Sequence, residues 1–162
     1  MPIKDNETKG RRRAVTDAIA LASDHGAIDL RAQLREHVTA RGLEAVDLGT
    51  HGPDSVDYPD FAAALAKSIQ EGRAARGILL CGTGIGASIA INRYPFIRAA
   101  LVHDVTGARL CREHNDANVL VLGGRTTGPE VARQCVDAFL DVGFEGGRHV
   151  RRVEKLGAMP AV

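Results

Sequence analysis

The chain has 162 residues, and its 21 basic and 20 acidic side chains leave a formal charge of +1 at pH 7. This length fits one domain with a full hydrophobic core. The balanced charge argues against nucleic acid or a strongly cationic molecule as partner, and no apolar run approaches the ~20 residues of a membrane-spanning helix. We therefore expect a small-molecule partner.

The N-terminal region divides into a tail and a domain. We predict a disordered basic tail over residues 1–13 and the folded domain over residues 14–162. The stretch 9–23 has the basic start and apolar end of a signal peptide, but Asp17 interrupts it and Asp24 and His25 follow at once. The three cysteines are widely spaced and lack a C-x-x-C pair, which argues against disulfides and favours a reducing, cytoplasmic location.

Short apolar runs and amphipathic patterns alternate along the rest of the chain. The runs predict strands at 18–23, 44–49, 77–81, 97–102 and 118–123. Apolar residues three and four apart predict helices at 27–42, 60–72 and 129–143, and Gly42, Gly72 and Gly143 stand where these helices should end. The alternation predicts an α/β fold: a single-domain, doubly wound parallel sheet of about five strands, Rossmann-like or flavodoxin-like.

The residues that follow each predicted strand are the first candidates for a site, because ligands of open parallel sheets bind beyond the carboxyl ends of the strands. They are Asp24-His25, Gly49-Thr50-His51, Cys81-Gly82-Thr83-Gly84, His103-Asp104 and Gly124-Arg125. This set is rich in titratable groups and glycines, which purely structural turns do not require.

The segment CGTGIG, residues 81–86, places three glycines between a predicted strand and a helix. Backbone N–H groups in such a loop can bind a phosphate or an oxyanion, assisted by the positive end of the helix dipole. No Lys-Ser/Thr pair follows, which excludes a Walker loop. Two alternatives stay open, a structural turn and a dinucleotide site formed by Gly82, Gly84 and Asp104, although the third glycine falls at position 86 instead of three residues after Gly84.

Cys81, the first residue of this loop, is either an inert small hydrophobe at a strand end or a reactive thiol. A helix N-terminus favours the thiolate, and a thiolate is a competent base. A thiol beside an anion-stabilising loop suits proton abstraction next to a carbonyl.

Three further segments have both a structural and a functional interpretation. His114, within residues 112–116, is either a solvated surface histidine or an acid-base group. Arg148 and Arg152 lie four apart at the start of a predicted helix, so their shared face is either solvated or grips a phosphate. In the segment DYP, residues 57–59, the proline suits the first turn of a helix and the tyrosine packs by default. No spacing of His, Asp and Glu matches a metal site.

Five segments, taken together, match a known family. They are SDH at 23–25, DYP at 57–59, CGTGIGASIAINR at 81–93, IRAALVHDVTGARLCREHNDANVLVLGGR at 97–125 and EGGRHVRRV at 145–153. They resemble the ribose-5-phosphate isomerase B family of sugar-phosphate aldose-ketose isomerases, which includes galactose-6-phosphate isomerase subunits and relatives acting on tetrose phosphates. The resemblance spans roughly residues 17–155.

This resemblance implies catalytic roles for the matching residues. Cys81 would be the base that moves a proton between C1 and C2, Thr83 would lie near the ring oxygen or hydroxyls of the sugar, and His114 would assist ring opening. Asn115 would contact the enediolate. The oxygens of the enediolate would be stabilised by backbone N–H groups of the loop that contains Gly82, Gly84 and Gly86.

The resemblance also implies substrate contacts. The positions similar to hydroxyl contacts are Asp24, Asp57 and Tyr58. Those similar to phosphate ligands are His25, Arg148 and Arg152, with Arg125 as a further candidate. Neither a metal nor a redox cofactor is implied.

Cys81 and Ala87 resemble the branch of the family with a cysteine base, because the other branch has serine and a glutamate at these positions. Members are usually dimers whose active site includes residues of the neighbouring subunit. We therefore expect a homodimer or a dimer of dimers, with the arginines of residues 145–153 serving the phosphate of the partner. Residues 26–28 and 48–56 depart from the common pattern, which leaves the length and stereochemistry of the sugar open.

The predicted activity is the isomerisation of ribose 5-phosphate to ribulose 5-phosphate through a cis-enediol. Another sugar phosphate, a tetrose 4-phosphate or a hexose 6-phosphate, is the first alternative. A nucleotide-binding module and a non-catalytic structural subunit are alternatives of a different class.

Overall fold

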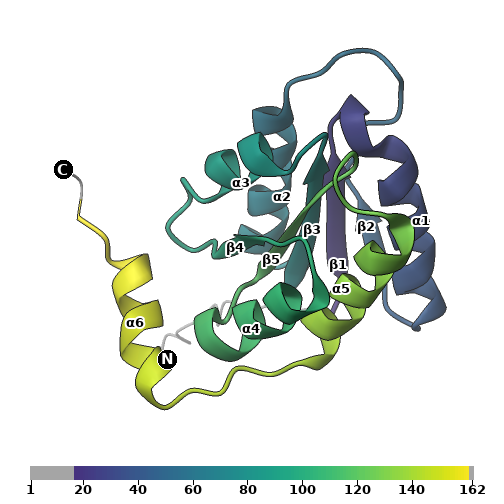
Figure 1. Ribbon diagram of the computed structural model, residues 1–162. Helices are drawn as coiled ribbons and strands as arrows, with labels where there is room; N and C mark the ends of the chain where they lie inside the picture. The colour runs from purple at the N-terminus through teal and green to yellow at the C-terminus, as the bar shows by residue number, and fades with distance from the viewer. Residues whose placement is uncertain (1–16, 161–162) are drawn as a thin grey trace, which may run out of the picture.

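The computed structural model describes residues 17–160, and the predicted basic tail lies outside this range. Five strands form one parallel sheet in the order β2-β1-β3-β5-β4 (Figure 1). They are β1 (Ile19–Ser23), β2 (Ala45–Asp47), β3 (Arg76–Cys81), β4 (Ala99–Leu101) and β5 (Val119–Gly123). The three inner strands are buried along almost their whole length, as their continuous apolar sequence predicts.

Helices cover both faces of the sheet. They are α1 (Ile28–Ala40), which follows a 3₁₀ turn at His25–Ala27, α2 (Tyr58–Gln70), α3 (Ile85–Ile91), α4 (Val105–Asn115), α5 (Pro129–Asp141) and α6 (Arg148–Gly157). Helices α1, α4 and α5 pack on one face, and α2 and α3 on the other. Helix α6 lies to one side and contacts α4 (Figure 1). No helix within residues 17–160 is long and apolar enough to cross a membrane.

Each face of the sheet has its own apolar core, because successive strand residues point to opposite sides. Leu21 and Phe139 belong to the core under α1, α4 and α5, whereas Leu79 and Leu65 belong to the core under α2 and α3. A Cβ on Gly77 would lie 2.5 Å from Leu65 Cδ2, so a glycine in β3 lets α2 pack closely against the sheet.

The predicted α/β fold is confirmed, with differences at the sheet edges. The strands predicted at 44–49 and 97–102 are only three residues long, and they are the two outer strands β2 and β4. An outer strand bonds to a neighbour on one side only, which supports fewer paired residues. The order also differs from the flavodoxin-like order 2-1-3-4-5 by an exchange of the last two strands.

Positive φ angles mark two of the three predicted helix ends. Gly42 has φ 80° and Gly72 has φ 70°, a backbone region that favours glycine. At the end of α5 the residue after the helix, Val142, is already extended, so Gly143 needs no such conformation.

Candidate active site

The candidate site lies where the direction of the strand order reverses. The chain leaves β1 for the outer strand β2 and then returns to β3 on the opposite side of β1, which opens a crevice at the carboxyl ends of β1 and β3. Asp24 and His25 follow β1, and Cys81 ends β3. The topology therefore brings these three predicted residues to one edge of the sheet.

Glycines allow the ends of β1, β3 and β5 to touch. A Cβ on Gly26 would lie 3.0 Å from the nitrogen of Gly82, and one on Gly124 would lie 2.8 Å from the oxygen of Gly26. The N–H of Gly124 also donates to the carbonyl of Cys81 at 2.8 Å. Any larger side chain at these positions would push the three segments apart.

The thiol of Cys81 is buried on the α2 and α3 side of the sheet, with 4% of the residue exposed. Its Sγ accepts the backbone N–H of Gly84 at 3.1 Å. Gly84 has φ 77° and is the residue from which α3 begins, so the loop turns sharply over the sulfur. This contact joins the thiol directly to the glycine loop.

Two other predicted residues, Tyr58 and Arg125, lie against the loop, and a third, Thr83, belongs to it. The ring of Tyr58, the first residue of α2, covers Gly86, where a Cβ would lie 2.5 Å from its Cζ. The Arg125 side chain lies against Gly82, with Nε 3.5 Å from the position of a Cβ there. Thr83 is exposed, and its Oγ1 accepts the N–H of Ile85 at 3.3 Å.

A cavity of about 450 Å³ opens over the segment that follows β1, lined by residues 25–30, His51, Gly52, Pro53 and Gly124. His25 Nδ1 accepts the N–H of Val56 at 3.2 Å, which ties the loop between β2 and α2 to the histidine. Asp24, the residue before His25, is buried, and its carboxylate accepts the N–H of Gly26 at 2.8 Å. His51, to which the sequence assigned no role, lies on the wall of this cavity.

Asp57, the residue before α2, is exposed and makes no side-chain bond that caps the helix.

The remaining predicted residues form a second group away from Cys81. Helix α4 leaves the carboxyl end of β4 and runs back, so His114 and Asn115 at its end lie toward the amino edge of the sheet. Arg148 and Arg152 are exposed on α6, which packs beside α4. One subunit therefore does not bring these four side chains to the thiol.

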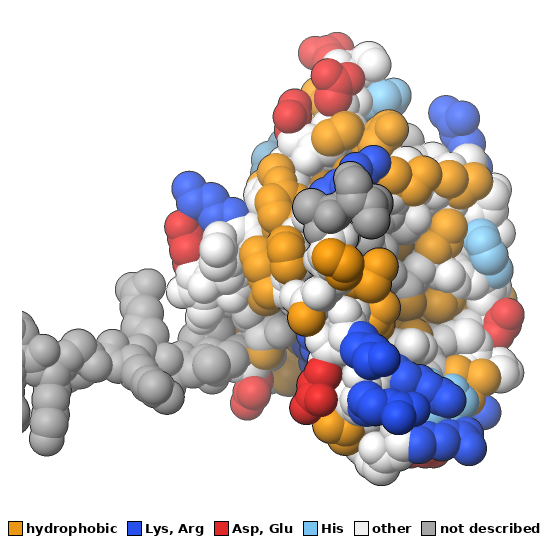
Figure 2. All heavy atoms as spheres, turned by 90° about the vertical axis from the view of Figure 1, so that its left-hand side faces the viewer, with side chains coloured by type: hydrophobic (Ala, Val, Ile, Leu, Met, Phe, Trp, Pro, Cys, Tyr) orange, Lys and Arg blue, Asp and Glu red, His pale blue; other side chains and the backbone are white. Residues whose placement is uncertain are grey.

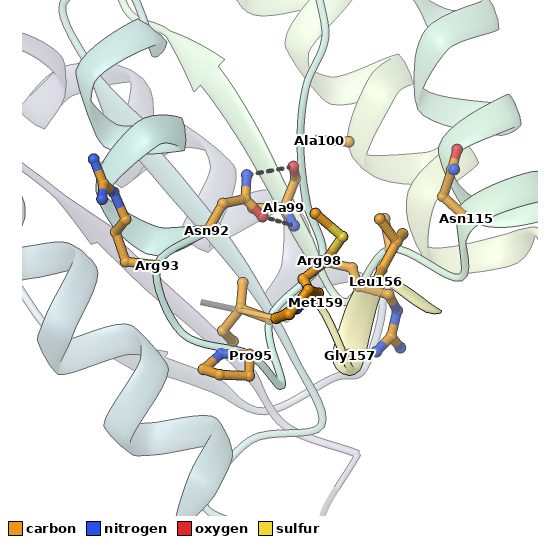
Figure 3. Close-up of a pocket in the computed structure, with 13 residues that line it drawn as sticks. Asn92, Arg93, Pro95, Arg98, Ala99, Ala100, Asn115, Leu156, Gly157 and Met159 are labelled. Carbon is orange, nitrogen blue, oxygen red and sulfur yellow. Dashed lines mark hydrogen bonds between the residues drawn. The ribbon is translucent and has the colours of Figure 1, made fainter. Parts of the chain in front are cut away.

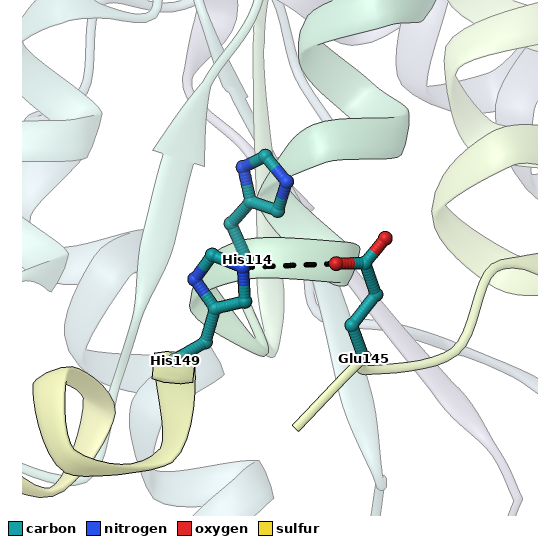
Figure 4. A group of neighbouring side chains, drawn as sticks. All are labelled: His114, Glu145 and His149. Carbon is teal, nitrogen blue, oxygen red and sulfur yellow. Dashed lines mark ion pairs between the residues drawn. The ribbon is translucent and has the colours of Figure 1, made fainter. Parts of the chain in front are cut away.

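The rings of His114 and His149 stack in this second group, with centroids 4.5 Å apart and planes at 16° (Figure 4). Glu145 Oε2 lies 3.6 Å from His149 Nε2. Burial lowers the pKa of His149, and the neighbouring His114 and Arg148 lower it further. The sequence analysis missed His149 and Glu145, because their relation to His114 exists only once α6 packs on α4.

Donor atoms of His114, Glu145 and His149 all lie within 4.8 Å of one another, a spacing that a metal ion can draw together. The two imidazole rings are nearly parallel, however, and the nitrogen lone pairs lie in the ring planes. They therefore do not point to a common position between the rings, and this arrangement favours stacking over metal coordination.

A larger cavity of about 990 Å³ lies between the end of α6, the outer strand β4 and the segment before it. Figure 3 shows Pro95, Arg98, Leu156 and Met159 around it, with Asn115 on one wall. Leu156 on α6 and Met159 just after it are exposed apolar side chains of this cavity, and Ile85 and Ile89 on α3 are exposed as well. On the face that carries α6, Figure 2 shows hydrophobic side chains above a group of Lys and Arg.

The arrangement of the glycine loop argues against a dinucleotide site. Asp104, the expected ribose ligand, instead accepts the N–H of Gly107 at 2.8 Å and caps α4. Gly86 is covered by Tyr58. The carboxylate of Asp104 is thus engaged in a helix cap, and the Tyr58 ring occupies the space above the last glycine of the loop.

Comparisons with known proteins agree with this geometry. The sequence model of the ribose/galactose isomerase family matches residues 19–156. The chain is 43% identical over 141 residues to ribose-5-phosphate isomerase B of Escherichia coli, covering 87% of this chain and 95% of that protein. It is 43% identical over 142 residues to D-erythrulose-4-phosphate isomerase of Pectobacterium atrosepticum, covering 86% and 93%.

The fold agrees as well. A crystal structure of a ribose 5-phosphate isomerase from Thermotoga maritima superposes with a TM-score of 0.86 at 50% identity, covering 88% of this chain and 98% of that one. The resemblance of the sequence motifs is thereby confirmed over nearly the whole described chain. With its thiol and glycine loop at the carboxyl edge of the sheet, the chain belongs to the ribose/galactose isomerase family and is a sugar-phosphate aldose-ketose isomerase.

Proposed function

We propose that the protein interconverts ribose 5-phosphate and ribulose 5-phosphate, with Cys81 as the base. The observation that carries the proposal is the position of the thiol, which bonds to the glycine loop and lies at the same sheet edge as Asp24 and His25. The thiolate takes the proton from C2 of the open-chain aldose, which leaves an enediolate with its negative charge on O1. Return of this proton to C1 and transfer of a proton from O2 to O1 complete the ketose.

The residues at the carboxyl edge divide the remaining work. Backbone N–H groups of residues 82–86 stabilise the enediolate oxygens, since donors fixed in advance act where charge develops. Asp24, Asp57 and Tyr58 contact sugar hydroxyls, and Thr83 lies near the ring oxygen. His25 and Arg125 bind the phosphate.

A second subunit completes the site in this proposal. Four residues lie apart from the thiol within one subunit: His114, Asn115, Arg148 and Arg152. The groups that open the sugar ring and bind its phosphate must nevertheless contact the same substrate molecule as the base. The exposed apolar side chains of α3 and α6 and the 990 Å³ cavity support a homodimer or a dimer of dimers, because large apolar patches mark interfaces. The partner's copies of the four residues would then face Cys81.

Subunit sharing can be tested by mixing two variants, Cys81→Ala and His114→Ala, after exchange of their subunits. Each variant alone is expected to be nearly inactive. A mixed dimer holds one intact site, so random exchange should restore about a quarter of wild-type turnover if each site takes residues from both chains. No gain on mixing would show that Cys81 and His114 act within the same chain.

The proposal also concerns which sugar phosphate the enzyme prefers. The relative named for erythrulose 4-phosphate is as similar in identity as the one named for ribose 5-phosphate, which makes a tetrose 4-phosphate the second candidate. A hexose 6-phosphate is the third. Comparison of kcat/KM for these three substrate lengths decides between them.

The activity is tested by incubating the protein with ribose 5-phosphate in D₂O with a metal chelator and following ribulose 5-phosphate and its deuterium by NMR. Cys81→Ala should lose at least ~10²–10⁴-fold in kcat, the usual contribution of a positioned base. Cys111→Ala is the matched control, because Cys111 is also a buried thiol but lies on the other face of the sheet. Near-normal turnover by a folded Cys81→Ala variant would remove Cys81 from the mechanism.

The three cysteines are free thiols, which supports a reducing compartment such as the cytoplasm as the site of action.

A further inference from the structure

We infer that His149 is a positioning residue for ring opening: its side chain stacks on His114 and holds that imidazole in the orientation in which it acts on the sugar. This inference rests on the proposed function, in which His114 assists opening of the ring. His149 itself touches neither the base nor the reacting carbons in this role.

The contact between the two rings is close and protected. His149 is only 5% exposed, although it belongs to a helix whose arginines are exposed. Its ring lies face to face with that of His114, 4.5 Å between centroids and 16° from parallel (Figure 4). His114 is the second last residue of α4, where its ring can otherwise rotate about two side-chain torsions. The stack removes much of that freedom.

The segment that delivers His149 is fastened to the same turn of α4. The N–H of Glu145 donates to the carbonyl of Glu113 at 3.0 Å, and Arg112 Nε donates to the carbonyl of Val142 at 3.3 Å. Glu113 and Arg112 are the two residues that precede His114. The start of α6 is therefore set in register with the histidine before any ligand binds.

Glu145 orients the supporting ring in turn. Its Oε2 lies 3.6 Å from His149 Nε2, beyond a direct hydrogen bond, so the carboxylate stands beside the edge of the supporting ring. Because burial lowers the pKa of His149, the stacked ring is the neutral imidazole.

The test separates ring opening from proton transfer. Ribose 5-phosphate closes into a furanose through its C4 hydroxyl, whereas ribulose 5-phosphate cannot close a five-membered ring because its C5 oxygen carries the phosphate. Exchange of the C1 proton of ribulose 5-phosphate with D₂O therefore reports enediolate formation alone. Turnover of ribose 5-phosphate reports ring opening as well.

His149→Ala is expected to lower kcat for ribose 5-phosphate by roughly tenfold, a fraction of what a positioned acid-base group supplies, with KM changed by less than about twofold. C1 exchange in ribulose 5-phosphate should stay within about twofold of the wild-type rate. His149→Phe keeps a stacking ring and should retain most of kcat, and Glu145→Gln should fall between the two. Glu154→Ala, at an exposed position on α6, is the matched control.

Three results would overturn the inference. The first is an equal loss of ribose 5-phosphate turnover and of C1 exchange in His149→Ala, which indicates a general structural role. The second is a His149→Ala variant in which neither rate falls, and the third is a His149→Phe variant with a kcat as low as that of His149→Ala. The imidazole proton resonances of His114 provide a readout independent of catalysis, because loss of the stacked ring should shift them in His149→Ala but much less in His149→Phe. If the wild type does not convert ribose 5-phosphate, the proposed function fails while this NMR comparison still decides whether His149 positions His114.

Discussion

The substitution Gly86→Ala tests whether the tyrosine that covers the glycine loop takes part in substrate binding. An alanine Cβ at position 86 would lie 2.5 Å from Cζ of Tyr58 and 2.9 Å from both Cε atoms. Carbon atoms in contact keep about 3.5 Å or more between them, so the ring must move away by about 1 Å. Tyr58 is 40% exposed and can move toward solvent without disturbing the core.

This displacement should affect activity far more than stability. An alanine within a helix is favoured over glycine by up to ~1 kcal/mol, which offsets the displacement of an exposed ring. The free energy of unfolding measured in urea should therefore stay within about 1 kcal/mol of the wild-type value. A hydroxyl misplaced by about 1 Å, however, can lower kcat/KM by up to ~100-fold.

A double-mutant cycle with Tyr58→Phe identifies the cause. If Gly86→Ala acts by moving the phenol oxygen, the same change in the Tyr58→Phe background should lower kcat/KM by less than roughly threefold, because that oxygen is already gone. Equal losses in both backgrounds would show that Gly86→Ala acts through the loop itself. A Gly86→Ala variant with wild-type kcat/KM would refute the argument from the ring contact.

Four other substitutions test separate parts of the molecule. Arg148→Ala should raise KM by roughly tenfold with kcat nearly unchanged, because a phosphate grip binds substrate and transition state alike; steady-state kinetics that show an unchanged KM would count against its role. Asp47→Asn should lower the free energy of unfolding in urea by about 3 kcal/mol, because it leaves the guanidinium of Arg31, 3% exposed and 3.2 Å from Asp47, without its counter-ion. Glu130→Gln, in an exposed pair with Arg133, should change that free energy by less than about 0.5 kcal/mol. Burial raises the pKa of Cys111 and of Cys135 to about 11, above the value near 9 that thiols have in the unfolded chain. Because the thiols of the unfolded chain ionise first, the free energy of unfolding should fall as pH rises from 9 to 11, by up to ~3 kcal/mol per thiol. Cys135→Ala should flatten this decline, and an unaltered slope would contradict it.

The carboxyl-edge half of the candidate site was accessible from sequence because parallel strands all end at one edge. Naming the residues after each apolar run was enough to group Asp24, His25, Cys81 and Arg125. The same logic included His51, whose place on the cavity wall needed only the path of one loop. Short edge strands were harder to delimit, because β2 and β4 gain hydrogen bonds from one neighbour only.

The second half of the site depends on packing between distant segments. His114 stands near the end of α4, and His149 is the second residue of α6, with the whole of β5 and α5 between them in sequence. No periodicity connects two such positions. Their stacking becomes visible only when the segment after α5 crosses the end of α4 and bonds to Glu113.

The bond between Val56 and His25 has a further consequence for the phosphate contact that we propose for His25. A backbone N–H can only donate, so the Nδ1 atom that receives it carries a lone pair, and the neutral ring keeps its proton on Nε2. His25 thus offers a directional donor without needing a charge. In the role that we propose for His25, this N–H donates to the substrate phosphate without adding a positive charge to the site. The loop between β2 and α2 is therefore more than a connection, because its backbone selects which nitrogen of the histidine is the donor.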